Sequence, residues 1–177
     1  MLKLEHIFLL HGKGGSPEGS ALSLEQCLRP RSPQTVFHRP RLLHADGAVL
    51  AEDSLADLRR REIPAQSLVI GVSLGGLLAA RLQETGREDL CVICVNSPTW
   101  VDAVRLERRL PNRVVFYSSH DEVIAGRTAE WPQLALAFDL PWLTHDTSEH
   151  ARPLAHLIWA YLQGKSVEKA IGELEGK

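Results

Sequence analysis

The sequence predicts an α/β fold, a three-layer sandwich in which a mainly parallel, six-stranded sheet lies between helices. The first indication is that short apolar runs alternate with longer runs of helical periodicity along the whole chain. The second is that the central runs, 67–72, 90–95 and 114–117, are almost entirely apolar, as strands covered on both faces must be. Parallel neighbours also need crossover connections, and the helical runs between the strands supply them.

Each expected strand is a short apolar run bounded by glycine, proline or a cluster of polar residues. The last one contains Pro141, which cannot donate a ladder hydrogen bond, so its pattern is the weakest. The expected strands are 6–10, 35–38, 67–72, 90–95, 114–117 and 140–143.

The segments between the strands carry apolar residues at helical spacing, and turn residues mark several of their ends. Pro64 ends the second helix. Gly86 closes the third, because glycine readily takes the left-handed backbone found after a helix C-terminus. The expected helices are 17–28, 48–61, 74–84, 101–110, 125–137, 153–162 and 166–174.

Length and composition restrict the class of protein. A chain of 177 residues corresponds to about one domain, so residues 1–177 are expected to form a single domain. The apolar fraction of 44% and the charged fraction of 24% are those of an ordinary globular protein. A net charge of −2 provides no electrostatic attraction to nucleic acid or to an anionic membrane, so neither is expected as a partner. The oligomeric state stays open.

The cysteines and the N-terminal residues favour a reducing compartment. The chain has 3 cysteines, an odd number that argues against a disulfide framework. Cys91 and Cys94 have the spacing of a zinc or redox motif, but they lie inside an apolar strand pattern and are expected in the core. The N-terminal residues 1–5 lead into a strand without the layout of a signal peptide, and no apolar run has the length of a membrane span. A cytoplasmic location is therefore expected.

A G-x-S-x-G pattern, Gly71 to Gly75 with Ser73 at its centre, lies between the third expected strand and the helix after it. A serine at the tip of such a sharp turn has its hydroxyl pushed out of the sheet, and the glycines leave room for the turn. The first N–H groups of the helix and the positive end of its dipole lie at the same point. The pattern alone also fits a glycine-rich turn without catalytic function, so motifs elsewhere in the chain must distinguish the two interpretations.

Other reactive groups follow the strands at their carboxyl ends, where parallel sheets bind their ligands. His11-Gly12 follows the first strand, Ser73 the third, Asp121 the fifth, and His145 and His150 the last. The serine, acid and histidine thus occur in the chain order Ser, Asp, His on one edge of one sheet.

The glycine-rich stretch after the first strand does not match a nucleotide-binding pattern. Ile7 stands where a P-loop has its first glycine, and Pro17 stands at the last glycine of the dinucleotide pattern. No metal-ligand spacing supports His145 and His150 as a metal site. Neither a cofactor nor a metal is expected.

In these motifs and their order the chain resembles the α/β-hydrolase superfamily, and in length it is similar to compact serine hydrolases with little or no lid. The likeness extends from Ile7 to about Leu162. It implies an α/β-hydrolase fold without a cap domain, and an oxyanion hole made by the backbone N–H groups of Leu74 and, from the His-Gly loop, Lys13. Gly12 and Trp100 are expected to line the substrate site.

The chemistry of such a site explains its residue types. A serine hydroxyl needs a base to become a nucleophile at neutral pH, histidine has a suitable pKa, and a carboxylate orients the imidazole. Ser73 is the expected nucleophile and Asp121 the expected acid, with Glu122 as the neighbouring alternative. His150 is the expected base because it directly precedes the last apolar helix, where the resembled family has its base; His145 is the alternative.

The expected function is hydrolysis of a small or exposed acyl ester through an acyl-enzyme intermediate. The segment between the fourth and fifth strands is short, which favours an open, shallow site for a small-molecule acyl substrate. A thioesterase, amidase or acyltransferase would use the same triad. The alternative from another class is a protein-binding module that keeps the hydrolase fold with little activity.

Overall fold

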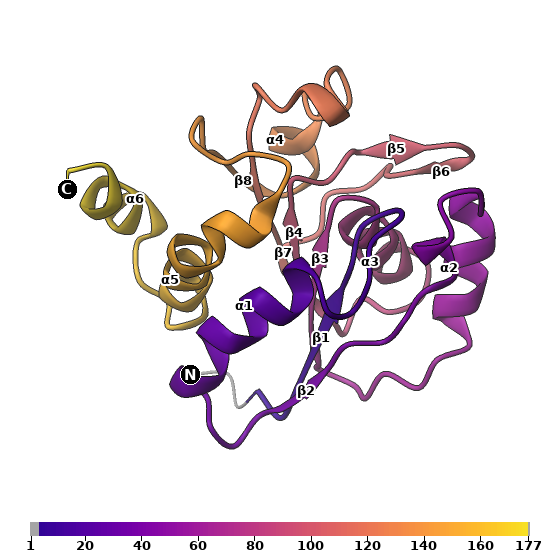
Figure 1. Ribbon diagram of the computed structural model, residues 1–177, viewed down its shortest axis with the longest axis horizontal. Helices are drawn as coiled ribbons and strands as arrows, with labels where there is room; N and C mark the ends of the chain where they lie inside the picture. Colours follow the sequence, from indigo (N-terminus) through magenta and orange to yellow (C-terminus); the bar gives the residue numbers. More distant parts are fainter. Residues whose placement is uncertain (1–3, 177) are drawn as a thin grey trace.

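The computed structural model describes residues 4–176 (Figure 1), so residues 1–3 and 177 of the expected single domain lie outside the described part. One six-stranded sheet runs through the molecule in the order β2-β1-β3-β4-β7-β8, and all of its strand pairs are parallel. The predicted parallel α/β sheet is therefore confirmed. Its strands are β1 His6–Leu10, β2 Val36–His38, β3 Leu68–Val72, β4 Cys91–Val95, β7 Arg113–Tyr117 and β8 Leu136–Asp139.

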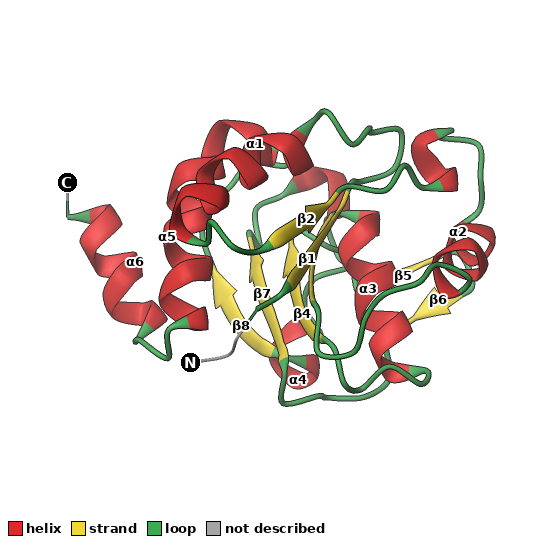
Figure 2. Ribbon diagram, turned by 90° about the horizontal axis from the view of Figure 1, so that it is seen from below, coloured by secondary structure: helices red, strands yellow, loops and turns green. Residues whose placement is uncertain are grey.

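Helices cover both faces of the sheet (Figure 2). The α-helices are α1 Ser20–Leu28, α2 Ala51–Arg59, α3 Leu74–Glu84, α4 Trp131–Leu134, α5 Ala151–Leu162 and α6 Val167–Glu175. Short 3-10 helices occur at η1 Arg29–Arg31, η2 Leu43–Ala45, η3 Glu122–Ile124 and η4 Thr147–His150. Residues 4–176 contain no helix that is long and apolar enough to cross a membrane.

The core has two halves, one on each face of the sheet, because successive strand residues point to opposite faces. On β1, Ile7 and Leu9 pack with the buried residues of α1 and α5. Phe8 and Leu10 pack instead with the buried residues of α2 and α3. Every residue of β3, β4 and β7 is buried, as predicted for strands that are covered on both sides.

The cysteine prediction is also confirmed for the two residues in β4. Cys91 and Cys94 are buried free thiols, and Cys27 is a free, half-buried thiol on α1. Burial raises the pKa of Cys91 to about 11 and that of Cys94 to about 12, so both stay protonated at neutral pH.

The predicted helix over 101–110 is wrong. The chain forms a short antiparallel hairpin there, in which β5 Trp100–Val101 pairs with β6 Val104–Arg105. Asp102, in the turn, has a φ of 51°. Aspartate is among the few non-glycine residues that tolerate this left-handed backbone, and it allows the chain to reverse at once.

The turn of this hairpin is attached to α2. The residue before α2 is Leu50, which has no side-chain oxygen to cap the helix. The carboxylate of Asp102 instead accepts a hydrogen bond of 3.1 Å from the backbone N–H of Ala51, the first residue of α2. A helix end in one part of the chain is thus capped by a residue from another part.

The last part of the sheet also differs from the prediction. The expected helix over 125–137 is reduced to α4, which begins at Trp131 with Pro132 in its first turn. The chain then forms β8, whose residues 136–139 pair with 114–117 of β7. The strand expected at 140–143 is therefore wrong: the final strand ends at Asp139, and residues 140–143 belong to the connection that follows it.

Candidate active site

The turn from β3 to α3 has the conformation of a strained elbow with Ser73 at its tip. Ser73 has φ 51° and ψ −124°, a combination that non-glycine residues rarely adopt. Its N–H donates a 2.9 Å hydrogen bond to the carbonyl of Val95 at the end of β4. Ser73 is half-buried, whereas Val72 and Leu74 on either side are buried. The serine is therefore the accessible residue of a rigid turn.

The glycines of the elbow have no space for a side chain. A Cβ on Gly71 would lie 2.4 Å from the carbonyl group of Gly75, and one on Gly76 would lie 2.0 Å from Ser97 Oγ. A Cβ on Gly75 would lie 2.6 Å from the backbone oxygen of His11. The glycine spacing in the sequence thus follows from close packing within the elbow and against the segments that follow β1 and β4.

The loop after β1 lies directly against the serine. A Cβ on Gly12 would be 3.1 Å from Ser73 Cβ and 3.7 Å from Ser73 Oγ. The next residue is Lys13, whose backbone N–H has no hydrogen-bond acceptor among residues 4–176. Leu74 is the first residue of α3, so its N–H has no acceptor within the helix. The two expected oxyanion donors therefore belong to the segments that adjoin Ser73.

Two buried histidines hold this loop. The N–H of Leu42 donates to His11 Nε2 at 3.0 Å, so His11 carries its proton on Nδ1, which donates to the carbonyl of Gly12 at 2.9 Å. His44 Nε2 donates to the carbonyl of His11 at 2.8 Å. The carbonyl of His44 accepts from the N–H of Gly14 at 2.8 Å. The loop is thus tied through both side chain and backbone of His44.

Both histidines are neutral in this arrangement. His44 Nε2 donates to a carbonyl, so in the neutral ring Nδ1 is an acceptor, and the hydroxyl of Ser54 on α2 donates to it at 2.6 Å. Burial lowers the pKa of His44 to about 4, and burial also lowers the pKa of His11. No role was expected for His44, because an isolated histidine in a polar loop has no sequence pattern that reports its partners.

Asp121 and His145 form a hydrogen-bonded pair at the carboxyl edge of the sheet. His145 Nδ1 lies 2.7 Å from Asp121 Oδ2, and Asp121 Oδ1 accepts a 2.9 Å hydrogen bond from the N–H of Val123. The Asp121 side chain is 1% exposed and that of His145 is 29% exposed. A carboxylate can only accept, so Nδ1 carries a proton, and in the neutral ring the lone pair is on Nε2. The neighbouring Glu122 is exposed.

The partner of Asp121 is therefore His145 and not His150, which differs from the pairing expected from the sequence. His150 Nε2 lies 2.9 Å from the hydroxyl of Thr144, and its ring is tilted against that of Trp142 with centroids 5.5 Å apart. The reason is the early end of β8 at Asp139, which lets the connection bring His145 back to the sheet edge. The residues after it wind into η4, and His150 becomes the residue that precedes α5.

Trp100, the other expected substrate-site residue, lies in the β5–β6 hairpin. It is half-buried, and the guanidinium of Arg127 lies over its ring, 4.6 Å from the centroid. One face of the indole is therefore covered by a cation, an arrangement that stabilises the ring's position. Among residues 4–176, no three His, Cys, Asp or Glu side chains gather closely enough to hold a metal ion.

Comparison with known proteins identifies the fold. No protein-family model matches the sequence, and no curated protein sequence matches it. Solved structures do match over nearly the whole chain. A pyrethroid hydrolase from Sphingobium faniae is similar with a TM-score of 0.63 and 17% identity, over 90% of this chain and 97% of that one.

Two further structures are similar to the same extent. Mouse α/β hydrolase domain-containing protein 10 has a TM-score of 0.69 and 13% identity, over 92% of this chain and 89% of that one. Est1E from Butyrivibrio proteoclasticus, solved with ferulic acid bound, has a TM-score of 0.69 and 12% identity, over 92% and 90%. The chain has the α/β-hydrolase fold, and in residues 4–176 the β5–β6 hairpin stands between β4 and β7 with no cap domain.

Proposed function

We propose that the protein is a serine hydrolase that cleaves a small or exposed acyl ester, with Ser73 as nucleophile, His145 as base and Asp121 as acid. The observation that carries the proposal is the 2.7 Å contact between Asp121 and His145, at the same sheet edge as the strained Ser73. A buried carboxylate that fixes the imidazole tautomer leaves Nε2 free to accept a proton, which is what a serine nucleophile needs.

The reaction follows from these groups. Ser73 Oγ attacks the carbonyl carbon of the ester, and its proton passes to His145 Nε2. The tetrahedral intermediate collapses, the alcohol leaves with the proton from Nε2, and the acyl group stays on Ser73. Water then repeats the attack with His145 as base, and the carboxylic acid is released. Asp121 stabilises the positively charged imidazolium that forms in each half.

The negative charge on the carbonyl oxygen is stabilised by the N–H groups of Leu74 and Lys13. Leu74 lies at the N-terminus of α3, where the helix dipole adds to the hydrogen bond. Gly12 between His11 and Lys13 allows the substrate to approach, because a side chain there would lie against Ser73. Trp100 contacts the substrate from the hairpin.

Support for the reaction class comes also from the similar structures. The Sphingobium faniae protein is named a hydrolase, and Est1E holds ferulic acid, a carboxylic acid such as ester hydrolysis releases. A thioester or an amide would pass through the same acyl-enzyme.

The proposal is tested at Ser73. The Ser73→Ala variant should hydrolyse a short p-nitrophenyl ester at least about 10⁴-fold more slowly than the parent, because the nucleophile is gone. A fluorophosphonate probe should label the parent at Ser73 and fail to label the variant, which is read by mass spectrometry of the peptide. Ser32→Ala, in the turn before β2 at the amino edge of the sheet, is the matched control and should behave as the parent does.

Two outcomes would contradict the proposal. If Ser73→Ala keeps the parental rate of ester hydrolysis, another group carries the activity. If the folded parent neither hydrolyses esters nor reacts with the probe near neutral pH, the fold serves as a protein-binding module instead.

A further inference from the structure

Asn96 is a buried polar residue between the strands that hold the candidate triad. It directly follows β4, which lies between β3 and β7 in the sheet. Its side chain is fully buried, and its φ is 40°, in the left-handed region.

The side-chain amide of Asn96 joins two loops. Asn96 Oδ1 accepts a hydrogen bond of 2.9 Å from the N–H of Ser118. Asn96 Nδ2 donates one of 2.7 Å to the carbonyl of Thr144. A backbone N–H can only donate and a carbonyl can only accept, so these partners determine which atom of the amide is oxygen and which is nitrogen.

The two loops are those of the acid and the base. The carbonyl of Ser118 accepts from the N–H of Asp121 at 3.2 Å, so Ser118 is part of the turn that presents the carboxylate. Thr144 directly precedes His145. The backbone before Asn96 also reaches the nucleophile, because the carbonyl of Val95 accepts the N–H of Ser73.

We propose that Asn96 is a positioning residue for the triad: its amide holds the Asp121 loop and the His145 loop in register and thereby maintains the hydrogen bond between the two side chains. The inference rests on the proposed function for its catalytic consequence. For its structural part it depends only on the two amide contacts, each of which connects a loop at the sheet edge to the residue that follows β4.

The residue type suits this role and offers two test variants. Asn, Asp and Gly tolerate left-handed backbone, so substitutions among them add little strain at φ 40°. Asn96→Asp keeps an oxygen for Ser118 and replaces the donor to Thr144 by an oxygen. Asn96→Gly removes both hydrogen bonds. It is the second variant because a protonated carboxyl group in Asn96→Asp could still donate to the carbonyl of Thr144.

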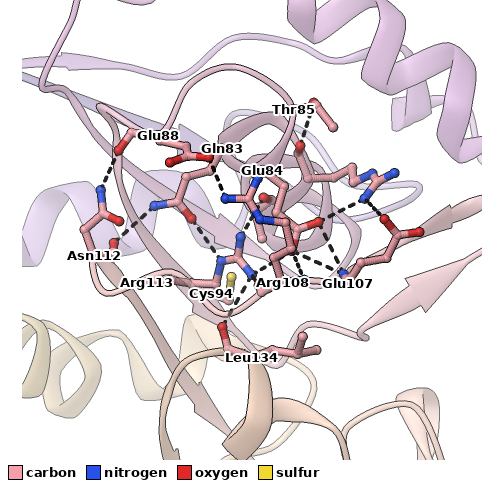
Figure 3. A network of polar contacts seen from close by, with 12 residues as sticks. Gln83, Glu84, Thr85, Glu88, Cys94, Glu107, Arg108, Asn112, Arg113 and Leu134 are labelled. Atoms are coloured by element: carbon pink, nitrogen blue, oxygen red, sulfur yellow. Dashed lines mark hydrogen bonds and ion pairs between the residues drawn. The ribbon is translucent and has the colours of Figure 1, made fainter.

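A second buried polar network supplies the control, because it stabilises the fold at the other edge of the sheet (Figure 3). Gln83 near the end of α3 accepts from Arg113 Nε at 2.9 Å and donates to the carbonyl of Leu90 at 2.9 Å. Arg113 begins β7, so this network is at the amino edge. Gln83→Met removes buried hydrogen bonds as Asn96→Gly does, but leaves the carboxyl edge unchanged.

The experiment measures the rate at which a fluorophosphonate probe labels Ser73, and the downfield NMR resonance of the His145 Nδ1 proton. Asn96→Asp and Asn96→Gly should label about 10- to 100-fold more slowly than the parent, since a misplacement of about 1 Å has an effect of that size. Their Nδ1 resonance should be lost to exchange with water. Gln83→Met should lower the melting temperature, label at the parental rate and keep the resonance.

The outcomes separate this inference from the proposed function. Parental labelling rates and a retained resonance in both Asn96 variants would overturn the inference while the serine hydrolase stands. A parent that does not label would overturn the proposed function, and the resonance alone would then decide whether Asn96 holds the Asp121–His145 pair.

Discussion

His145 and His150 lie in one short connection between β8 and α5, yet their rings have different partners. His145 donates to the buried carboxylate of Asp121, and His150 is in contact with Thr144 and Trp142. A base for Ser73 must be both oriented and accessible. His145 meets both conditions, because its Nδ1 is engaged and its side chain is partly exposed.

The two histidines can be distinguished by substitution. His145→Ala should reduce ester turnover and fluorophosphonate labelling of Ser73 by about 10³-fold or more, because the serine loses its base. His150→Ala should stay within a few-fold of the parent. Steady-state rates and labelling rates of both variants, with far-ultraviolet circular dichroism to verify folding, provide the measurement. The reverse order of effects would transfer the role of base to His150.

At the scale of single residues, the sequence indicates a role when a local turn determines it. It does not indicate a role that depends on partners far along the chain. The elbow at Ser73 is such a local pattern, since its glycines are required by contacts under 3 Å. Asn96 and His44 act through hydrogen bonds to segments far along the chain. The choice between His145 and His150 depended on where β8 ends, which single-sequence patterns do not define well.

At the scale of elements, buried polar contacts join helices to strands, as they do between α3 and β7. Arg113 is fully buried at the start of β7, and its Nη1 donates to Glu84 Oε1 at 3.2 Å. Glu84 ends α3 and also accepts the backbone N–H of Arg108 at 2.9 Å. This pair connects the end of α3 to the chain that enters β7 (Figure 3), so the helix and strand are held by charge as well as by apolar contact.

Glu84→Ala should lower the free energy of unfolding by about 3–5 kcal/mol, because the Arg113 guanidinium would remain buried without its carboxylate. The double variant Glu84→Ala/Arg113→Met should recover part of that loss. Urea denaturation gives both values. Glu88→Ala, which breaks an ion pair with Arg108 at the surface, is the control and should change stability by less than about 1 kcal/mol. An equal loss in Glu84→Ala and the control would contradict this account.

The elements that the sequence predicts well are those whose pattern is set by burial. The strands β3 and β4 are apolar throughout, and β7 is apolar after Arg113, because helices cover both faces of these strands. The β5–β6 hairpin and β8 were missed for different reasons. The hairpin depends on left-handed backbone at Asp102. Strand β8 lies at the edge of the sheet, where partly exposed residues weaken the alternation of apolar and polar side chains.

For the molecule as a whole, the neutral buried histidines make stability depend on pH. In the unfolded chain His44 has the ordinary pKa of about 6.5, and in the folded protein its pKa is about 4. Between these values the unfolded state binds more protons, so the free energy of unfolding falls as the pH is lowered. His11, whose pKa is also lowered, acts in the same direction.

Lowering the pH from about 7 to about 4 should therefore remove stability, with His44 contributing on the order of 3 kcal/mol. His44→Gln keeps an N–H for the carbonyl of His11 but does not titrate, so its stability should depend less steeply on pH over this window. Denaturant unfolding at a series of pH values measures the slope. The exposed His120→Gln is the control and should keep the parental slope. Parallel profiles for His44→Gln and the parent would contradict the prediction.

The Asp102 carboxylate that caps α2 restricts the order in which parts of the protein can fold during synthesis. Asp102 is translated after all of α2 and α3, yet it supplies the acceptor for the first N–H of α2. Until the β5–β6 turn has emerged from the ribosome, α2 of the nascent chain therefore lacks its cap. The N-terminal half therefore reaches its final form only when the middle of the chain has emerged and folded back onto it.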